Sequence, residues 1–545
     1  MSTGEFTTST APTQTRPALA GRLTQATYAH LGLALCLVLA LIPILSTPTP
    51  PLFDYPNHLA RVHVIAHWAD TPLFRANFEI TSFLIPNVLA DVVLLGLMPL
   101  GGVEVAGRVF LALILALTLT GGYALNRAVA GRFTVWSLLI AALLYNEMFM
   151  WGFLNYMLGL GLLLWGLAAW LSLDGRHRTT QLILATAFAL LTFFAHLVAF
   201  ALYAIAIAVI ELRRAWVVRR RGLLPAARHL IASAAPFIPP LILFFAVSPS
   251  GKLPFDPQFD YSQFGKLTPF TRLLSAGNPT MDMVTLVSVT AVVAIALAAR
   301  RITLHWGLAL TGLVYLALIL SLPYSMLGSY FVDSRIVIAL AFILVAAIRP
   351  RRDSRRRGTI FLAVLLIGLM TTRSVALAED WRAQGHEFGR LLAAFDKLPR
   401  GSLLIPAVGH PFELGDWIAT RYIKPSHEHS TLYATIRRGV LVSNIFARRG
   451  QNPLVLTPVL DDIGKLSNPV SRILNQGDSR WVVNEVMQFL DQLDEIQPAI
   501  RNVYVVGYKV RCDYWPEDLP IRPVACDNGF SLFAMDRSWP VRRMW

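Results

Sequence analysis

The chain has 545 residues, of which 55% are hydrophobic and 15% charged, and its mean hydropathy is +0.53. A soluble protein of this length carries about a quarter charged residues. Several apolar runs are also long enough to cross about 30 Å of hydrocarbon. The composition therefore excludes an ordinary soluble protein and predicts a polytopic α-helical membrane protein.

The net charge of +15 has an uneven distribution along the chain. From Glu379 to the C-terminus, 20 Lys and Arg stand against 19 Asp and Glu, so the excess lies in the membrane half. There the arginines gather in short loops, which is the positive-inside pattern of membrane proteins. Because the basic segments lack interleaved aromatic residues, the pattern argues against nucleic acid as a partner.

Residues 1–25 are rich in Ser, Thr and Pro and are expected to be a disordered cytoplasmic N-terminus. Eleven apolar segments are predicted to span the membrane: 28–46, 104–125, 133–149, 153–172, 180–195, 197–212, 230–247, 283–299, 304–322, 335–348 and 359–375. The segment 83–100 contains Pro86, Asp91 and Pro99, so we expect an interfacial helix inside a long first periplasmic loop, 47–103. This arrangement predicts that the N-terminus lies inside and the C-terminus outside.

After Arg373 the composition changes towards that of a soluble domain. The stretch "DWRAQGHEFGRLLAAFDKLP" is typical of an amphipathic helix, and "GSLLIPAV", "NVYVVGYKV" and "GFSLFAMD" are typical of strands, with a helical segment near 480–495. We therefore divide the chain into a transmembrane domain, 26–375, and a periplasmic α/β domain, 376–545. Cys512 and Cys526 fall in this second domain, where a disulfide is predicted and two unrelated thiols are the alternative.

The stretch "FDYPNHLARVHVI" in the first loop combines polar residues in a pattern that suggests chemistry. Pro56 favours a helix start, and on that helix His58 and Arg61 share a face. Asp54, just ahead of the helix, could take a proton from an acceptor hydroxyl, and a cation one turn away could hold a phosphate. The alternative is a surface helix with a solvated charge pair.

Further polar residues are predicted on the same side of the membrane as Asp54. They are Asn87, Asp91, Arg108, Asn146, Glu147, Asn155, His196, Lys266, Arg272, Asp333 and Arg335. Charges at membrane depth are costly and mark function or paired structure, and their gathering on one side predicts a site at the outer interface. Simpler readings are also open: a helix break at His196, a local Asp333–Arg335 ion pair, a snorkelling Arg108 and a turn capped at Glu147.

Other chemistries find little support in the sequence. There is no Walker loop, HExxH or CxxC motif. His63 and His67 share a helical face, but without a third ligand no metal site is predicted. His427 and His429 in "PSHEHS" have the spacing of a strand or loop and are expected at the surface.

With these elements in place, the sequence resembles the GT-C superfamily of integral membrane glycosyltransferases, which includes protein O-mannosyltransferases and aminoarabinose transferases. "FDYPNHLAR" is similar to the acidic residue and first helix of their long external loop, "PNVLADVVLLGLMPLGG" to the second helix, and "VEVAGRVFLALILALTLTGGYALNRAV" to the following span. Familiar members often show an Asp-Glu pair, whereas here Tyr55 follows Asp54. The chain also resembles uncharacterised proteobacterial membrane proteins that share "DYPNHLAR" and "WGFLNY".

The resemblance implies transfer of a sugar from a polyprenyl-phosphate donor to a lipid, glycan or protein acceptor at the periplasmic face. It makes Asp54 the general base and assigns acceptor or phosphate contacts to the remaining candidates: His58, Arg61, Asn87, Asp91, His196, Lys266, Arg272 and Arg335. The need for a divalent metal stays open. The alternatives are a lipid or glycolipid flippase and a non-catalytic membrane scaffold.

Overall fold

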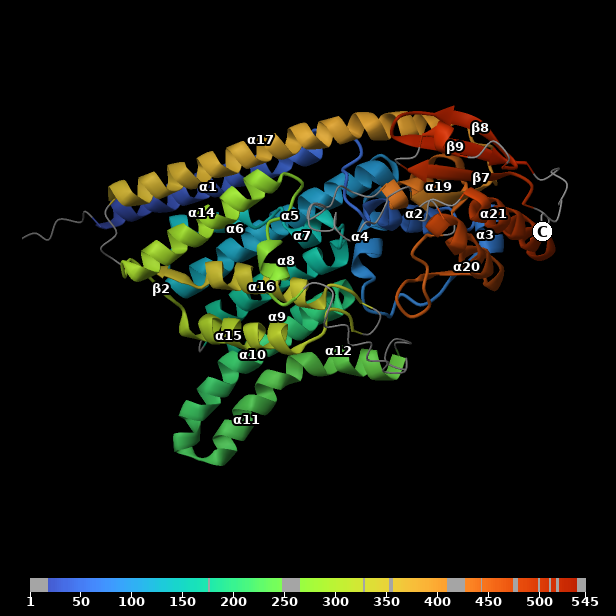
Figure 1. Ribbon diagram of the computed structural model, residues 1–545. Coiled ribbons are helices and arrows are strands. Elements are labelled where there is room, and N and C mark those ends of the chain that lie inside the picture. Colours follow the sequence, from blue (N-terminus) through green and yellow to red (C-terminus); the bar gives the residue numbers. More distant parts are fainter. Residues whose placement is uncertain are drawn as a thin grey trace, which may run out of the picture.

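The computed structural model describes residues 18–174, 177–247, 265–326, 329–351, 356–408, 427–442, 444–473, 479–497, 500–508, 511–515 and 519–536. A helical bundle forms most of the molecule, and a smaller domain with a β-sheet lies at one end of it (Figure 1). The predicted disordered segment 1–25 lies in part outside the described residues, and helix α1 begins at Ala18.

Seven helices of the described chain are long and apolar enough to cross a membrane. They are Thr27–Leu45 within α1 (Ala18–Leu45), Gly102–Ala130 (α5), Leu154–Ser172 (α8), Arg178–Ala195 (α9), Leu223–Ala246, Pro279–Ala298 (α14) and Gly358–Phe395 within α17 (Arg356–Phe395). The span Leu223–Ala246 is made of α11 (Leu223–Ala234), η4 (Ala235–Phe237), α12 (Ile238–Ile242) and most of η5 (Leu243–Val247). Large apolar side chains remain exposed along these helices, as lipid-facing surfaces require. The protein is therefore a polytopic membrane protein.

The remaining predicted spans differ from these seven for local reasons. Helix α10 (Leu197–Val218) carries Glu211, Arg213 and Arg214 near its end, and α15 (Trp306–Ser321) and α16 (Val332–Ala346) have 16 and 15 residues. All three pack against one another within the bundle.

The predicted span 133–149 does not form one helix. It divides into η2 (Val135–Leu138), α6 (Leu139–Ala142) and α7 (Glu147–Met150). Asn146 ends the apolar run, because its side-chain amide donates to the carbonyls of Leu143 and Leu144 while its Oδ1 accepts the Phe149 N–H. The cap of this turn is therefore Asn146 rather than Glu147.

The first loop folds onto the end of the bundle through two helices. Helix α2 (Tyr55–Ala66) packs on α5 at Gly107, where a Cβ would clash with Tyr55 and Leu59. Helix α4 (Leu89–Leu97), followed by η1 (Met98–Leu100), is too short to cross a membrane and contacts α2, α5, α8 and α9. Between α2 and α4 lie α3 (Pro72–Asn77) and strand β1 (Phe78–Ile80).

The C-terminal domain is built around a five-stranded mixed sheet in the order β5-β4-β7-β9-β8. Its strands are β4 (Leu403–Val408), β5 (Leu441–Val442), β7 (Val503–Tyr508), β8 (Ile521–Cys526) and β9 (Phe530–Met535). The three strands expected from the sequence correspond to β4, β7 and β9. Its helical elements are η7 (His427–Thr431), α19 (Leu432–Arg438), α20 (Pro458–Ile473), α21 (Ser479–Ile496) and η8 (Cys512–Tyr514).

Two features join this domain to the rest of the molecule. Helix α17 continues without a break past the predicted boundary at residue 376, and it runs beside α1 along the bundle (Figure 1). Strand β6 (Leu454–Leu456) pairs antiparallel with β1 of the first loop. The domain is therefore held over the loop that carries Asp54. At the opposite end of the bundle, β2 (Ile302–Leu304) pairs with β3 (Ile348–Pro350).

The predicted disulfide is present between Cys512 and Cys526, whose Cα atoms are 5.7 Å apart. We expect the double variant Cys512→Ala and Cys526→Ala to lose about 3 kcal/mol of domain stability, because a cross-link of this loop length restricts the unfolded chain. Thermal unfolding in detergent, followed by tryptophan fluorescence, measures the change. Cys36→Ala, at a buried free cysteine of α1, is the control. Reductant should lower the unfolding temperature of Cys36→Ala, which keeps the disulfide, and should leave that of the double variant unchanged. An equal effect of reductant on the two variants would contradict the prediction.

Candidate active site

The two short stretches "DYPNHLAR" and "WGFLNY" lie against each other in the structure. The Asp54 N–H donates to the Trp151 carbonyl at 3.0 Å, and the Phe53 N–H donates to the Met150 carbonyl at 3.1 Å. Gly152 has φ 75°, and a Cβ there would lie 2.8 Å from the Asp54 nitrogen. The turn after α7 therefore fixes the backbone at Asp54 and requires glycine at that point.

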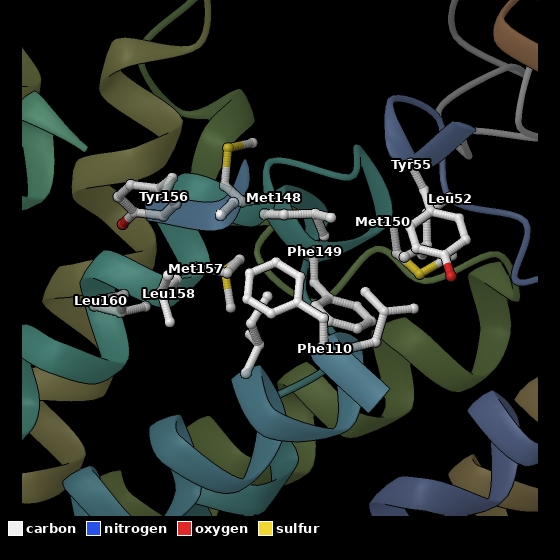
Figure 2. Close-up of a cluster of buried hydrophobic side chains, with 14 of the residues drawn as sticks. Leu52, Tyr55, Phe110, Met148, Phe149, Met150, Tyr156, Met157, Leu158 and Leu160 are labelled. Carbon is white, nitrogen blue, oxygen red and sulfur yellow. The ribbon is translucent and has the colours of Figure 1, made fainter. Parts of the chain in front are cut away.

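A buried apolar cluster packs against the contact between the Asp54 loop and the turn after α7. Leu52 and Tyr55 of the first loop lie beside Met150, with Phe149 and Phe110 next to them (Figure 2). These side chains are 3% exposed or less. Because packed interiors tolerate little movement, the cluster gives the loop a rigid base.

Asp54 is 8% exposed and lies at the N-terminus of α2. Its Oδ1 is 4.0 Å from Nε2 of His429, which comes from η7 of the C-terminal domain. The expectation that His429 is a surface residue was wrong, since it is 7% exposed and packs against the ring of Phe53 at 4.7 Å between centroids. Burial lowers the pKa of His429 to about 4, so its imidazole is neutral at pH 7.

His58 and Arg61 are committed to contacts within the first loop. Arg61 donates to Oδ1 of Asp91 from Nε at 2.9 Å and from Nη2 at 2.8 Å, and also to Nδ1 of His58 at 2.9 Å. The exposed fractions of Arg61 and Asp91 are 1% and 0%. Burial and the neighbouring Arg61 lower the pKa of His58 well below its usual value. The buried Arg61–Asp91 ion pair therefore joins α2 to α4.

We expect Asp91→Asn and Arg61→Met each to destabilise the protein by about 3–5 kcal/mol, because either change leaves one buried charge without its partner. The double variant removes both charges and should recover much of that loss. Thermal unfolding of the purified protein measures these differences. Additive losses in the double variant would contradict the prediction.

Asn87 and Asn155 form a second connection within the site. Asn87 has φ 65°, and its carbonyl accepts from Nδ2 of Asn155 at 2.8 Å. Oδ1 of Asn155 in turn accepts the Ala90 N–H at 3.1 Å. The start of α4 is thereby held on the first turn of α8.

A second polar cluster lies between α7, α13 (Thr268–Thr271) and α16. Arg272 Nη1 is 3.6 Å from Oε1 of Glu147, and Lys266 Nζ is 3.2 Å from Oδ2 of Asp333. Burial raises the pKa of Glu147 to about 7 against the opposing effect of Arg272. The alternative reading of a local Asp333–Arg335 ion pair is not what the structure shows, since Asp333 pairs with Lys266 instead.

Arg335 differs from the other buried arginines. It is 5% exposed, its guanidinium lies 4.7 Å from the centre of the Phe153 ring, and it donates to the Ser329 hydroxyl. No carboxylate of the described chain lies within ion-pair distance of it, and its Nε has no hydrogen-bond partner there. A buried cation in this state favours an anionic ligand.

His196 lies at the junction of α9 and α10, as the sequence predicted. Its Nδ1 accepts the Val198 N–H at 3.1 Å and so caps α10. The ring also contacts Tyr156 at 5.6 Å between centroids, and the Arg335 guanidinium lies 6.0 Å from the centre of that tyrosine ring. The imidazole therefore borders the Arg335 cluster while it satisfies the helix end.

A series of aromatic ring contacts runs from Phe53, next to Asp54, to Phe153, on which the Arg335 guanidinium lies. Trp151 contacts Phe53 at 4.8 Å and Phe331 at 4.7 Å between ring centroids, and Phe153 contacts Phe331 at 5.9 Å. Phe331 precedes α16 with φ 60°, which is uncommon for an aromatic residue and is the kind of strain that gathers at functional sites. The rings connect the Asp54 end of the site to the Arg335 end.

A separate pocket of about 650 Å³ lies away from this site, beside His63 and His67. Glu104 and the residues around Met98 line its other side. Among the described residues, no three His, Cys, Asp or Glu side chains gather as they would around a metal ion.

The bundle, the helical first loop and the C-terminal α/β domain together define an integral membrane protein with the GT-C fold. Among solved structures, the chain is similar to ArnT from Cupriavidus metallidurans, both bound to undecaprenyl phosphate and in the apo state. The TM-scores are 0.52 and 0.54, the identities 12% and 14%, and each alignment covers 93% of this chain and 98% of ArnT. No protein-family model and no curated protein sequence matches the chain.

Proposed function

We propose that this protein is a glycosyltransferase that moves a sugar from a polyprenyl-phosphate donor to a lipid, glycan or protein acceptor. The likeness in fold to a protein bound to undecaprenyl phosphate supports the class of donor. We place the reaction at the periplasmic face of a bacterial inner membrane, with the N-terminus in the cytoplasm and the C-terminal domain in the periplasm. The arginine-rich loops of the membrane half support this orientation.

The observation that carries the proposal is the buried guanidinium of Arg335, which has no carboxylate within ion-pair distance in the described chain and lies at the far end of the aromatic rings that begin beside Asp54. Transfer from a lipid phosphate needs a fixed cation for the leaving phosphate and a base for the incoming hydroxyl. We assign the cation to Arg335 and the base to Asp54, although nearly three hundred residues separate them in the chain.

In the proposed reaction, the acceptor oxygen attacks the anomeric carbon of the donor sugar while the bond from that carbon to the phosphate oxygen breaks. Asp54 takes the proton of the acceptor hydroxyl. The electron pair of the broken bond stays on the polyprenyl phosphate, whose charge Arg335 stabilises together with Lys266, Arg272 and His196.

The other predicted site residues have a different role in this proposal. His58, Arg61 and Asp91 position the first loop, because Arg61 donates to both of the others. Asn87 does so through its backbone carbonyl, which accepts from the Asn155 side chain. Asp54 then acts on the acceptor, and Arg335, with the three side chains named beside it, acts on the donor phosphate.

The test is the conversion of the donor by the purified protein. We expect release of free undecaprenyl phosphate, measured by mass spectrometry, when the protein is given undecaprenyl-phosphate-linked sugars and an extract of envelope lipids and glycans. A flippase would instead move the intact donor across proteoliposomes without consuming it. Movement without consumption would overturn the proposal.

A further inference from the structure

Asn57 links helix α2 to the C-terminal domain, and its amide can be oriented from its partners. Its Oδ1 accepts the Phe446 N–H at 2.6 Å, and its Nδ2 donates to the Asn444 carbonyl at 3.2 Å. These two backbone groups distinguish the oxygen from the nitrogen, because an N–H requires an acceptor and a carbonyl requires a donor. The amide nitrogen is therefore the atom that faces Nδ1 of His429.

This contact determines the tautomer of His429. Since the Asn57 amide nitrogen donates, Nδ1 of His429 accepts and carries no proton. A neutral imidazole then holds its proton on Nε2, the atom that faces Oδ1 of Asp54. A charged imidazole would instead direct an Nδ1–H at the amide N–H of Asn57, which is unfavourable.

The separation of Nε2 and Oδ1 is 4.0 Å, which is too long for a direct hydrogen bond. It is, however, the separation expected of two groups that both form a hydrogen bond with the same oxygen atom. An oxygen about 2.8 Å from each would meet both at an angle of about 90°. Such an oxygen would accept from the Nε2–H and donate its own proton to Asp54.

We propose that His429 binds the acceptor, by donating from Nε2 to the hydroxyl oxygen that Asp54 deprotonates. The inference rests on the proposed function and adds a catalytic residue from the C-terminal domain. The oxygen uses one lone pair to accept from His429 and the other to form the bond to the anomeric carbon. Its proton passes to Asp54, and the bond between the anomeric carbon and the donor phosphate breaks.

The surroundings of His429 hold the ring in this orientation. Phe53 lies on one side at 4.7 Å and Phe446 at 5.1 Å between centroids. The titratable groups that face it are Asp54, from the start of α2, and His58, from the next turn of the same helix. His58 is itself held by Arg61, so the Nε2–H of His429 is directed at the carboxylate.

The arrangement also selects the chemical class of the acceptor. A hydroxyl oxygen has two lone pairs, so it can accept from His429 and still attack the sugar. A neutral amine has one lone pair and cannot do both at once. We therefore infer that the acceptor is an alcohol rather than an amine.

The first experiment replaces His429 in the full chain and measures transfer to benzyl alcohol and, separately, to O-benzylhydroxylamine, whose nitrogen is uncharged at neutral pH. With undecaprenyl-phosphate-linked sugars as donors, we expect His429→Phe to reduce kcat/KM for the alcohol about 10- to 100-fold. The KM for the donor and the midpoint of thermal unfolding should stay near those of the wild type. His429→Gln keeps an N–H donor and should restore part of the loss. His386→Phe, at an exposed position of α17, is the matched control.

In the wild type, kcat/KM should be higher for the alcohol than for O-benzylhydroxylamine. The ratio of these two values should be smaller in His429→Phe. Unchanged alcohol kinetics in that variant would overturn the proposal, as would an equal loss for both acceptors together with a lower unfolding midpoint. A wild type that consumes none of the donors would instead count against the proposed function.

The second experiment needs no turnover and tests the geometry directly. Nitrogen-15 NMR of histidine-labelled protein, with His429→Phe supplying the assignment, reports which ring nitrogen carries the proton. We expect neutral His429 with its proton on Nε2 at pH 7. A charged ring, or a proton on Nδ1, would overturn the proposal whatever the enzyme assay shows.

Discussion

Replacing Asp54 with Asn is expected to reduce sugar transfer by about 100- to 10,000-fold, which is the range that a general base contributes. The amide has nearly the same size as the carboxylate but cannot take the proton of an acceptor hydroxyl. The backbone contact of Asp54 with Trp151 does not involve the side chain, so the loop should keep its position. The measurement is the initial rate of undecaprenyl phosphate release by purified protein.

The structure gives a reason to expect stable protein from this variant. Asp54 makes no side-chain hydrogen bond as the N-cap of α2, so the substitution removes no helix cap. Asp70→Asn, at an exposed position of the same loop, is the control and should retain the wild-type rate. If Asp54→Asn is folded and turns over normally, Asp54 is not the base.

Replacing Arg335 with Gln is expected to weaken the binding of undecaprenyl phosphate about 100-fold. A charge-assisted hydrogen bond to a buried group contributes about 1.5–3 kcal/mol, and the guanidinium also supplies charge for the leaving phosphate. Arg335→Lys retains the charge without the planar group, so its affinity for undecaprenyl phosphate should lie between those of the wild type and Arg335→Gln. Binding is measured from the increase in unfolding temperature at rising concentrations of the lipid.

The same variant should behave differently when no lipid is present. Arg335 has no carboxylate partner within the described residues, so its burial costs free energy that Gln does not. The unfolding temperature of Arg335→Gln without lipid should therefore equal or exceed that of the wild type. The control is Arg301→Gln, at an exposed loop position, which should respond to the lipid as the wild type does. A less stable variant that binds the lipid normally would show that Arg335 is structural.

Most of the architecture could be predicted from local patterns in the sequence. The apolar runs identify the membrane helices because each must cover a hydrocarbon layer of nearly constant thickness. The change in composition after Arg373 identifies the C-terminal domain, although α17 runs through the boundary. The segment 133–149 was misjudged because the hydrogen bonds of Asn146 end the helix despite the apolar residues around it.

The candidate site could be predicted only in part. The sequence predicts Asp54 as a candidate because it is a charged residue directly after a membrane span, which is a local signal. His429 gives no such signal, since the role that we propose for it depends on its position beside a residue 375 positions earlier in the chain. In sequence, Arg61 and Arg335 were equal candidates for a phosphate, and the structure separates them, because Asp91 neutralises the first and no described carboxylate pairs with the second.

The sequence by itself determined that this is a membrane bundle with a polar first loop and an α/β domain, since hydropathy and periodicity act over short stretches of chain. The tertiary structure decided which charges are paired and which buried polar groups meet at Asp54. The physical reason is that a charge or hydrogen bond acts over a few ångströms in space, whatever the number of residues between its partners.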